Sequence, residues 1–148
     1  MGEEISRREM LRKLSPLGRV ELDAARCSGC GLCARECPSG ALAVSGGEAG
    51  VFRLLFKYGV CLACGQCVEV CPEKALCLER CLEPGSLGNE VVLFQDDIVR
   101  CSACGAPVGP RKMVEKVRAR VKMARSELCI ACKSRDWSGL FKDNGHVA

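Results

Sequence analysis

Two short stretches of this sequence, 27–38 and 61–72, carry the same cysteine pattern, C-x2-C-x2-C-x3-C-P. Three cysteines at intervals of three residues can wrap a tight loop around one face of an iron–sulfur cube, and the fourth cysteine, which precedes a proline, is directed away from that loop. The alternatives are a pair of zinc knuckles or a set of disulfides. Zinc needs only four ligands and no third evenly spaced cysteine, and disulfides do not explain identical spacing. The pattern therefore predicts two [4Fe–4S] clusters.

These stretches form the centre of an internal repeat with a period of 34 residues, relating 27–44 to 61–78. Each half is expected to end in a short strand, at 41–44 and at 75–78. A glycine follows the second cysteine of each run, where the chain must pass close to the cluster, and positive φ angles are expected there. The positions that match between the halves are the four cysteines, Gly31/Gly65, Pro38/Pro72, Ala41/Ala75 and Leu42/Leu76.

Composition supports metal as a structural component. The chain has 148 residues, of which 48% are apolar, but that share includes 14 cysteines, and only six residues are aromatic. The organic core is therefore thin, and folding is expected to depend on bound metal. Metal-ligating cysteines indicate a reducing compartment, so we expect a cytoplasmic protein, either free or at the cytoplasmic face of a membrane complex. No stretch approaches the ~20 apolar residues of a membrane span, so direct membrane insertion is not expected.

The formal charge of +4 counts every thiol as neutral. Eight cluster thiolates, set against two cube cores of about +2 each, add about −4, and a zinc site with four thiolates adds about −2 more. The protein with its metals would then carry a charge near −2. The basic composition is therefore weak evidence for a nucleic-acid partner.

The N-terminal segment 1–19 is predicted to form a docking helix. Ser6 and Glu9 have the spacing of a capping box, which would begin a helix that runs to about Leu14 and ends before Pro16. The adjacent Arg7 and Arg8 are similar to a twin-arginine export motif, but no apolar region of signal-peptide length follows them. Export is therefore not expected.

Further elements are expected around and after the repeat. Strands are predicted at 20–23 and 51–60, with a turn or flexible loop at 45–50 between the halves. Cys77 and Cys81 exceed the eight cluster ligands and are interpreted as buried or idle thiols, with a redox pair or a ligand role as the alternatives. The segment 83–95 is interpreted as a linker with a strand; strands at 90–94 and 98–100 would flank a turn at 95–97.

A second unit is predicted at 96–140, followed by a loose tail at 141–148. It contains two C-x2-C pairs, which can close tetrahedrally on one zinc ion; the alternatives are a third iron–sulfur cluster, a single iron or no metal. Between the pairs, 111–125 has the apolar spacing of one helical face, and the opposite face is basic. That apolar face is expected to cover the unit's own core. The predicted metal ligands are Cys101, Cys104, Cys129 and Cys132.

The two cysteine runs, each followed by Pro and then by Ala-Leu, resemble the bacterial 2[4Fe–4S] ferredoxin family over residues 20 to about 80, which places such a domain at 20–82. The resemblance implies an α+β fold, a pseudo-twofold repeat of two strands and a short helix, here followed by a small zinc-ribbon-like C-terminal unit. It also implies crossed ligation. By that pattern Cys27, Cys30, Cys33 and Cys71 would hold one cluster, and Cys61, Cys64, Cys67 and Cys37 the other.

The whole chain resembles, in its arrangement and short motifs, the small iron–sulfur subunits of hydrogenase-linked complexes such as formate hydrogenlyase, which can carry a paired C-x2-C tail. This implies a relay of single electrons between larger redox subunits of a hydrogenase- or formate dehydrogenase-type complex, with no substrate bound directly. Catalytic residues are not predicted. All eight cluster ligands are cysteines, which leaves no iron open, and the one histidine, His146, lies near the C-terminal end.

Two other functions remain open from the sequence. A free, diffusing ferredoxin has the same clusters but needs no second metal unit. An iron–sulfur and zinc protein that binds nucleic acid is favoured by the basic helix face at 111–125. The few aromatic residues available for base stacking count against this second alternative.

Overall fold

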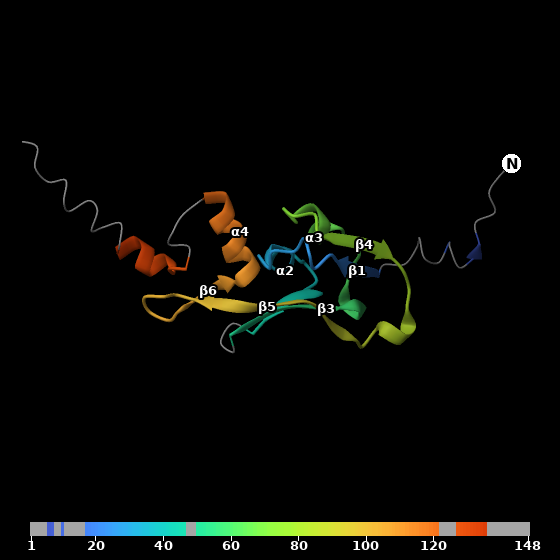
Figure 1. Ribbon diagram of the computed structural model, residues 1–148. Helices are drawn as coiled ribbons and strands as arrows, with labels where there is room; N and C mark the ends of the chain where they lie inside the picture. The colour runs from blue at the N-terminus through green and yellow to red at the C-terminus, as the bar shows by residue number, and fades with distance from the viewer. Residues whose placement is uncertain (1–5, 8–9, 11–16, 47–49, 122–126, 136–148) are drawn as a thin grey trace, which may run out of the picture. The chain divides into compact units, whose positions relative to one another are not determined.

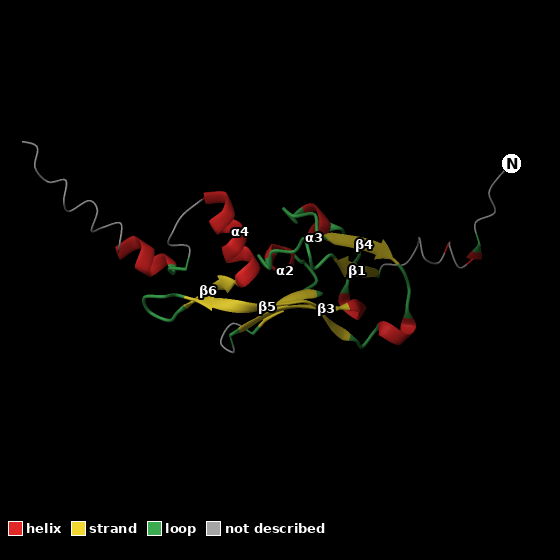
Figure 2. Cartoon of the chain, viewed as in Figure 1, coloured by secondary structure: helices red, strands yellow, loops and turns green. Residues whose placement is uncertain are grey.

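The computed structural model describes residues 6–7, 10, 17–46, 50–121 and 127–135. The chain has mixed α and β structure (Figures 1 and 2). It divides into two compact units: unit 1 comprises Met1–Ser45 and Arg53–Gln95, and unit 2 comprises Gly46–Phe52 and Asp96–Ala148. The division passes through two strands, β3 (Val51–Lys57) and β5 (Glu90–Arg100).

In unit 1, the strand that precedes each cysteine run pairs with the strand that ends the other half of the repeat. β1 (Gly18–Leu22) is antiparallel to β4 (Leu76–Arg80), with Val20 opposite Leu78. β2 (Leu42–Ser45) is antiparallel to β3, with Leu42 opposite Phe56. These strands confirm the elements predicted at 20–23, 41–44 and 75–78 to within two residues.

The core of unit 1 follows from strand periodicity. Along β3, Leu54 and Phe56 are buried, whereas Arg53 and Lys57 are exposed. This alternation is the pattern of a strand with one face on the core. Leu42, Ala41, Ala75 and Leu76 from the ends of the two halves are also buried.

The backbone repeats as well as the sequence. Positive φ angles occur in three pairs of positions that are 34 residues apart, so the two halves have the same local turns. The glycines in front of α2 (Leu32–Arg35) and α3 (Gln66–Glu69) have φ of 70° and 81°, which confirms the prediction for them. The three pairs are Gly29/Ala63, Gly31/Gly65 and Gly40/Lys74.

The left-handed conformation at Gly40 predicts a specific cost for a side chain there. Its φ is +67°, and a Cβ at this position would have no atom within 4 Å. Gly40→Ala should therefore lower stability by about 1 kcal/mol through backbone strain alone. Thermal unfolding of the metal-loaded protein under anaerobic conditions should show a midpoint lower by about 4–8 °C.

Gly85 provides the matched control, because a Cβ there would also have no atom within 4 Å and its φ lies outside the left-handed region. Gly85→Ala should leave the midpoint nearly unchanged. An equal decrease in both variants would contradict the assignment of the cost to the left-handed turn.

The strand predicted at 51–60 is too long. β3 ends at Lys57 and is followed by a 3-10 turn, η1 (Tyr58–Val60). Tyr58 is buried, and its hydroxyl donates to the carbonyl of Cys81 at 2.6 Å and accepts from the N–H of Glu83 at 2.7 Å. This side chain draws the backbone out of the extended conformation.

The turn predicted at 95–97 is wrong, because β5 continues from Glu90 to Arg100. The polar residues there have partners distant in sequence. The Gln95 side-chain oxygen accepts from Arg53 Nε at 3.0 Å, and an Asp96 carboxylate oxygen accepts from the backbone N–H of Lys112 at 2.8 Å. Polar residues whose side chains hydrogen-bond to groups distant in sequence can lie within a continuous strand.

Unit 2 contains a strand that the sequence did not predict, β6 (Pro107–Pro110). It is antiparallel to β5, with Val99 opposite Gly109, and it occupies the edge of the strand order β2-β3-β5-β6. Prolines are tolerated at such an edge. The segment 83–95 contains a short 3-10 turn, η2 (Pro84–Ser86), and the first part of β5.

The predicted helix at 111–125 begins as expected. α4 spans Arg111–Val121, and residues 122–125 lie outside the described residues. Val114 is buried, but Val117 and Val121 are 47% and 53% exposed. The prediction that this whole face covers the unit's own core is therefore wrong. A further helical segment covers residues 130–135.

The predicted N-terminal helix is described only in part. The Met10 N–H donates to the Ser6 carbonyl at 2.9 Å, which is one helical hydrogen bond, whereas Glu9 and 11–16 lie outside the described residues. The tail 141–148, with His146, also lies outside them. Within the described part of the chain, no helix has the length and apolar character needed to cross a membrane.

Candidate metal centres

The first cysteine loop gathers three thiols at the start of α2. Cys33 is buried, Cys27 is half-buried and Cys30 is exposed. The Gly29 N–H lies 3.4 Å from Cys27 Sγ. Burial, followed by the negative charges of Cys30 and Cys27, raises the pKa of Cys33 to about 12. Three thiolates this close together repel one another, so a cationic group between them would favour their ionised forms.

The second loop has the same arrangement at the start of α3. Cys61 and Cys67 are buried and Cys64 is exposed. The pKa of Cys67 is raised to about 11 by burial, and then by the charges of Cys61, Cys37 and Cys64. The charge of Cys37 acts on this loop although Cys37 belongs to the first run.

A hollow in unit 1 contains the four cysteines that crossed ligation would require for one cluster. It is also lined by Phe56, Val20 and Leu78. A lining of apolar side chains and thiols suits a group that is held by sulfur and shielded from water. The cysteines that line it are Cys37, Cys61, Cys64 and Cys67.

Cys37 and Cys71, the last cysteines of the two runs, lie among hydrogen-bond donors. Burial raises the pKa of Cys37, but the backbone N–H of Leu42, the hydroxyl and N–H of Ser39 and the N–H of Ala41 together lower it below its usual value. The Cys71 Sγ accepts from the Ala75 N–H at 3.3 Å. Its place beside the first loop stays a prediction, as do both complete ligand sets.

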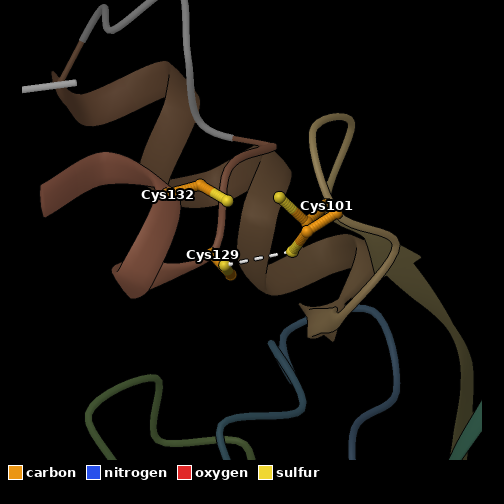
Figure 3. A group of neighbouring side chains, drawn as sticks. Cys101, Cys129 and Cys132 are labelled. Carbon is orange, nitrogen blue, oxygen red and sulfur yellow. Dashed lines mark hydrogen bonds between the residues drawn. The ribbon is translucent and has the colours of Figure 1, made fainter. Parts of the chain in front are cut away.

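Unit 2 holds a separate cluster of four cysteines. Their Sγ atoms all lie within 4.8 Å of one another, and Cys104 Sγ is 3.6 Å from Cys129 Sγ. Figure 3 shows Cys101, from the turn after β5, facing Cys129 and Cys132. Four sulfurs at ~2.3 Å from one ion form a tetrahedron with edges of ~3.8 Å. The sulfur atoms therefore fit a single ion, whereas a cube would place four irons between them and force them further apart.

Local hydrogen bonds position the two cysteine pairs. The Cys101 N–H donates to the Ala106 carbonyl at 2.8 Å, and the Gly105 N–H returns to the Cys101 carbonyl at 2.9 Å. Gly105 has φ of 73°, as such a knuckle requires. The Ser102 N–H donates to the Glu127 carbonyl at 3.3 Å, which connects the first pair to the segment before Cys129.

The four thiols of unit 2 divide their protons unequally. The N–H of Cys129, followed by those of Ala103 and Cys104, lowers the pKa of Cys101 to about 6 despite burial. Hydrogen bonds with Cys104 and Cys129, together with burial, raise the pKa of Cys132 to about 12. A divalent cation would replace the shared protons. Metal binding should therefore release protons and weaken as the pH falls.

The sequence did not predict an apolar groove that lies in unit 2. Ile130 is 85% exposed beside it, and Val117 on α4 is 47% exposed. The apolar spacing of α4 was visible in the sequence, but spacing does not reveal which apolar side chains remain uncovered. The groove is lined by Pro107, Val108, Met113, Val114, Val117, Leu128, Cys129, Ile130, Ala131 and Lys133.

The two surplus cysteines differ in environment. Cys77 is exposed on β4 and Cys81 is buried, with Sγ 3.9 Å from the Tyr58 hydroxyl. Neither belongs to the four-cysteine cluster of unit 2. The interpretation of Cys81 as a buried thiol is confirmed.

Residues 26–75 match the family model of a 4Fe-4S dicluster domain. No curated protein matches the chain. The match, together with the 14 cysteines, supports a ferredoxin-type iron–sulfur protein with a role in electron transfer. Domains of this type are typically electron carriers and not catalysts.

Proposed function

We propose that this chain relays single electrons between redox subunits of a larger oxidoreductase complex of the hydrogenase or formate dehydrogenase type. The observation that carries the proposal is the hollow that collects Cys37 with the three cysteines of the second loop. A cluster held there would take ligands from both halves of the repeat. The other cluster would be held by the first loop and Cys71. The short segments between the third and fourth cysteine of each run would then connect the two clusters.

The arrangement suits conduction better than catalysis. The bound clusters supply one-electron chemistry, and the protein holds and shields them. With four cysteines for each cluster, no iron is left open to a substrate. Cys33 and Cys67 are buried, whereas Cys30 and Cys64 are exposed. Each cluster would thus have one ligand at the surface, where the redox centre of a partner can approach.

We also propose a structural zinc ion on Cys101, Cys104, Cys129 and Cys132. The Sγ separations support a single tetrahedral ion over a third cluster. Four thiolates complete the coordination of zinc and leave no position for a substrate. The zinc would connect the turn after β5 to the helical segment at 130–135.

The apolar groove of unit 2 supports docking to a larger subunit. Exposed apolar surface rimmed by polar residues is typical of a protein interface. α4 carries five basic residues and one acidic residue, and Lys133 lines the groove. We therefore expect the partner to present apolar side chains flanked by acidic ones. Rim charges of this kind chiefly affect the association rate and its salt dependence.

Charges placed in the groove should abolish assembly. Ile130→Asp and Val117→Asp change exposed side chains, so unit 2 should keep its fold and its metal. When the tagged protein is purified anaerobically, the variants should lose the co-purifying redox subunits that the wild type retains. Val92→Asp is the control, because Val92 is 52% exposed on the part of β5 that belongs to unit 1.

A wild-type protein that runs only as a monomer of 15.9 kDa in native extract would contradict the complex and favour a free, diffusing ferredoxin. The nucleic-acid alternative is supported by the basic residues of α4. It is weakened by ion pairs within unit 2, which join Arg111 to Asp97 and Arg118 to Glu127 at 3.6 Å each. Salt-dependent binding to generic DNA or RNA at physiological ionic strength would favour it.

A further inference from the structure

The two equivalent cysteines Cys37 and Cys71 differ in one side-chain neighbour. Both accept from the N–H of the alanine four residues further on. Cys37 has a second partner, because the Ser39 hydroxyl oxygen lies 3.6 Å from its Sγ. The repeat places Glu73, 34 residues later, at the position of Ser39. A hydroxyl therefore lies beside Cys37 Sγ, and the residue at the matching position of the other half carries a carboxylate.

The backbone around these positions makes the same turns in both halves, so the halves differ here in their side chains, Ser39 against Glu73 and Gly40 against Lys74. Gly40 and Lys74 follow them with φ of 67° and 48°. Ser39 and Glu73 are both half-buried. At such sites hydrogen bonds and charges are only partly screened by water.

These side chains act oppositely on a bound cluster. The Sγ of Cys37 stands for an iron-bound thiolate, which has no proton, so the Ser39 hydroxyl must be the donor. A donated hydrogen bond stabilises the more negative, reduced cluster and raises its reduction potential. A carboxylate in the same place repels the added electron and lowers the potential.

We propose that the Ser39/Glu73 difference sets the order of the two potentials, so that the cluster held by Cys37, Cys61, Cys64 and Cys67 has the higher one. The proposal rests on the proposed function, because it assumes two crossed clusters. A single electron supplied from outside then resides on that cluster at equilibrium. Transfer through the chain runs downhill from the first loop toward the second.

An EPR-monitored redox titration with dithionite tests the proposal. In Ser39→Ala the higher reduction potential should fall by about 59 mV. For a one-electron couple this is about a tenfold change in the ratio of reduced to oxidised cluster. This is the size expected for one hydrogen bond to a charged group. Ser39→Thr keeps the hydroxyl and should retain the wild-type potential. Glu73→Ser should raise the lower potential. Ser39→Ala and Glu73→Ser should therefore each reduce the difference between the two reduction potentials.

Ser28 provides a matched control in the first loop. It is only 6% exposed, and within the described residues its hydroxyl makes no hydrogen bond to a cysteine. Ser28→Ala should move neither potential. The signal that Ser39→Ala shifts should be the one that Cys64→Ser perturbs.

The outcomes separate this proposal from the proposed function. Two reversible one-electron couples that Ser39→Ala leaves unchanged, or a shift confined to the cluster of the first loop, would overturn the ordering alone. A shift of similar size in Ser28→Ala would also overturn it. A protein without two such couples would overturn the electron relay itself.

Discussion

Removal of the proposed zinc ion is expected to unfold unit 2 while both proposed iron–sulfur clusters remain. The described part of unit 2 has few buried apolar side chains, of which Val114 is one, and two of its buried residues are the predicted ligands Cys101 and Cys132. Structural zinc contributes about 10–16 kcal/mol in small domains. That exceeds or equals the ~5–15 kcal/mol by which a whole domain is usually stable.

Metal analysis and hydrogen exchange measure this effect. The wild type should contain about 8 Fe, 8 sulfides and 1 Zn per chain. Cys129→Ser should lose the zinc and the exchange protection of α4, with the iron retained. Cys77→Ser is the control, since it changes an exposed cysteine of β4. Zinc should also leave as the pH falls, because protons compete for the thiolates. About 12 Fe with no zinc would instead establish a third cluster.

Crossed ligation predicts which cysteine substitutions resemble each other. Cys37 lines the same hollow as Cys64 although it belongs to the other run. Replacing either with serine exchanges a soft ligand for a hard one on the same cluster. Cys37→Ser should therefore alter or abolish the EPR signal that Cys64→Ser affects. Cys71→Ser should pair with Cys30→Ser in the same way.

The opposite pairing would contradict the arrangement. If Cys37→Ser changed the signal that Cys30→Ser changes, each run would hold its own cluster. Spectra of all four variants, recorded at equal extents of reduction, separate the two cases. A variant that changes both signals would be ambiguous, so the iron content of each variant is measured first. It should fall by about 4 Fe where a whole cluster is lost.

The sequence predicted the repeat and its strands because their determinants are local. Evenly spaced cysteines, paired glycines and short apolar runs act within a few residues. Two predictions were wrong because a distant partner determines the local conformation. Tyr58 ends β3 through its hydrogen bond to the Cys81 carbonyl. Gln95 accepts a hydrogen bond from Arg53 without interrupting its strand. β6 was missed because its two prolines argue against a strand unless an edge position is known.

The candidate sites show the same difference between features that local sequence determines and features that depend on the fold. The spacing of the cysteines predicts twelve ligands, but whether four sulfurs surround one ion or a cube depends on distances that only the fold supplies. The groove was missed for a related reason. Apolar spacing on α4 marks a face to be buried, and it does not distinguish Val114, which the unit covers itself, from Val117, which it leaves exposed.

The pairing of β1 with β4 and of β2 with β3 means that neither half of the repeat has a sheet of its own. Every strand ladder within the repeat is made between the halves, and Gly18 meets Arg80 across about sixty residues of chain. Loop closure over that distance costs entropy before any contact repays it. A nascent chain that ends before Val51 therefore lacks the partner strands of both β1 and β2. We therefore expect the β1–β4 ladder to form only after the chain has been synthesised as far as Arg80.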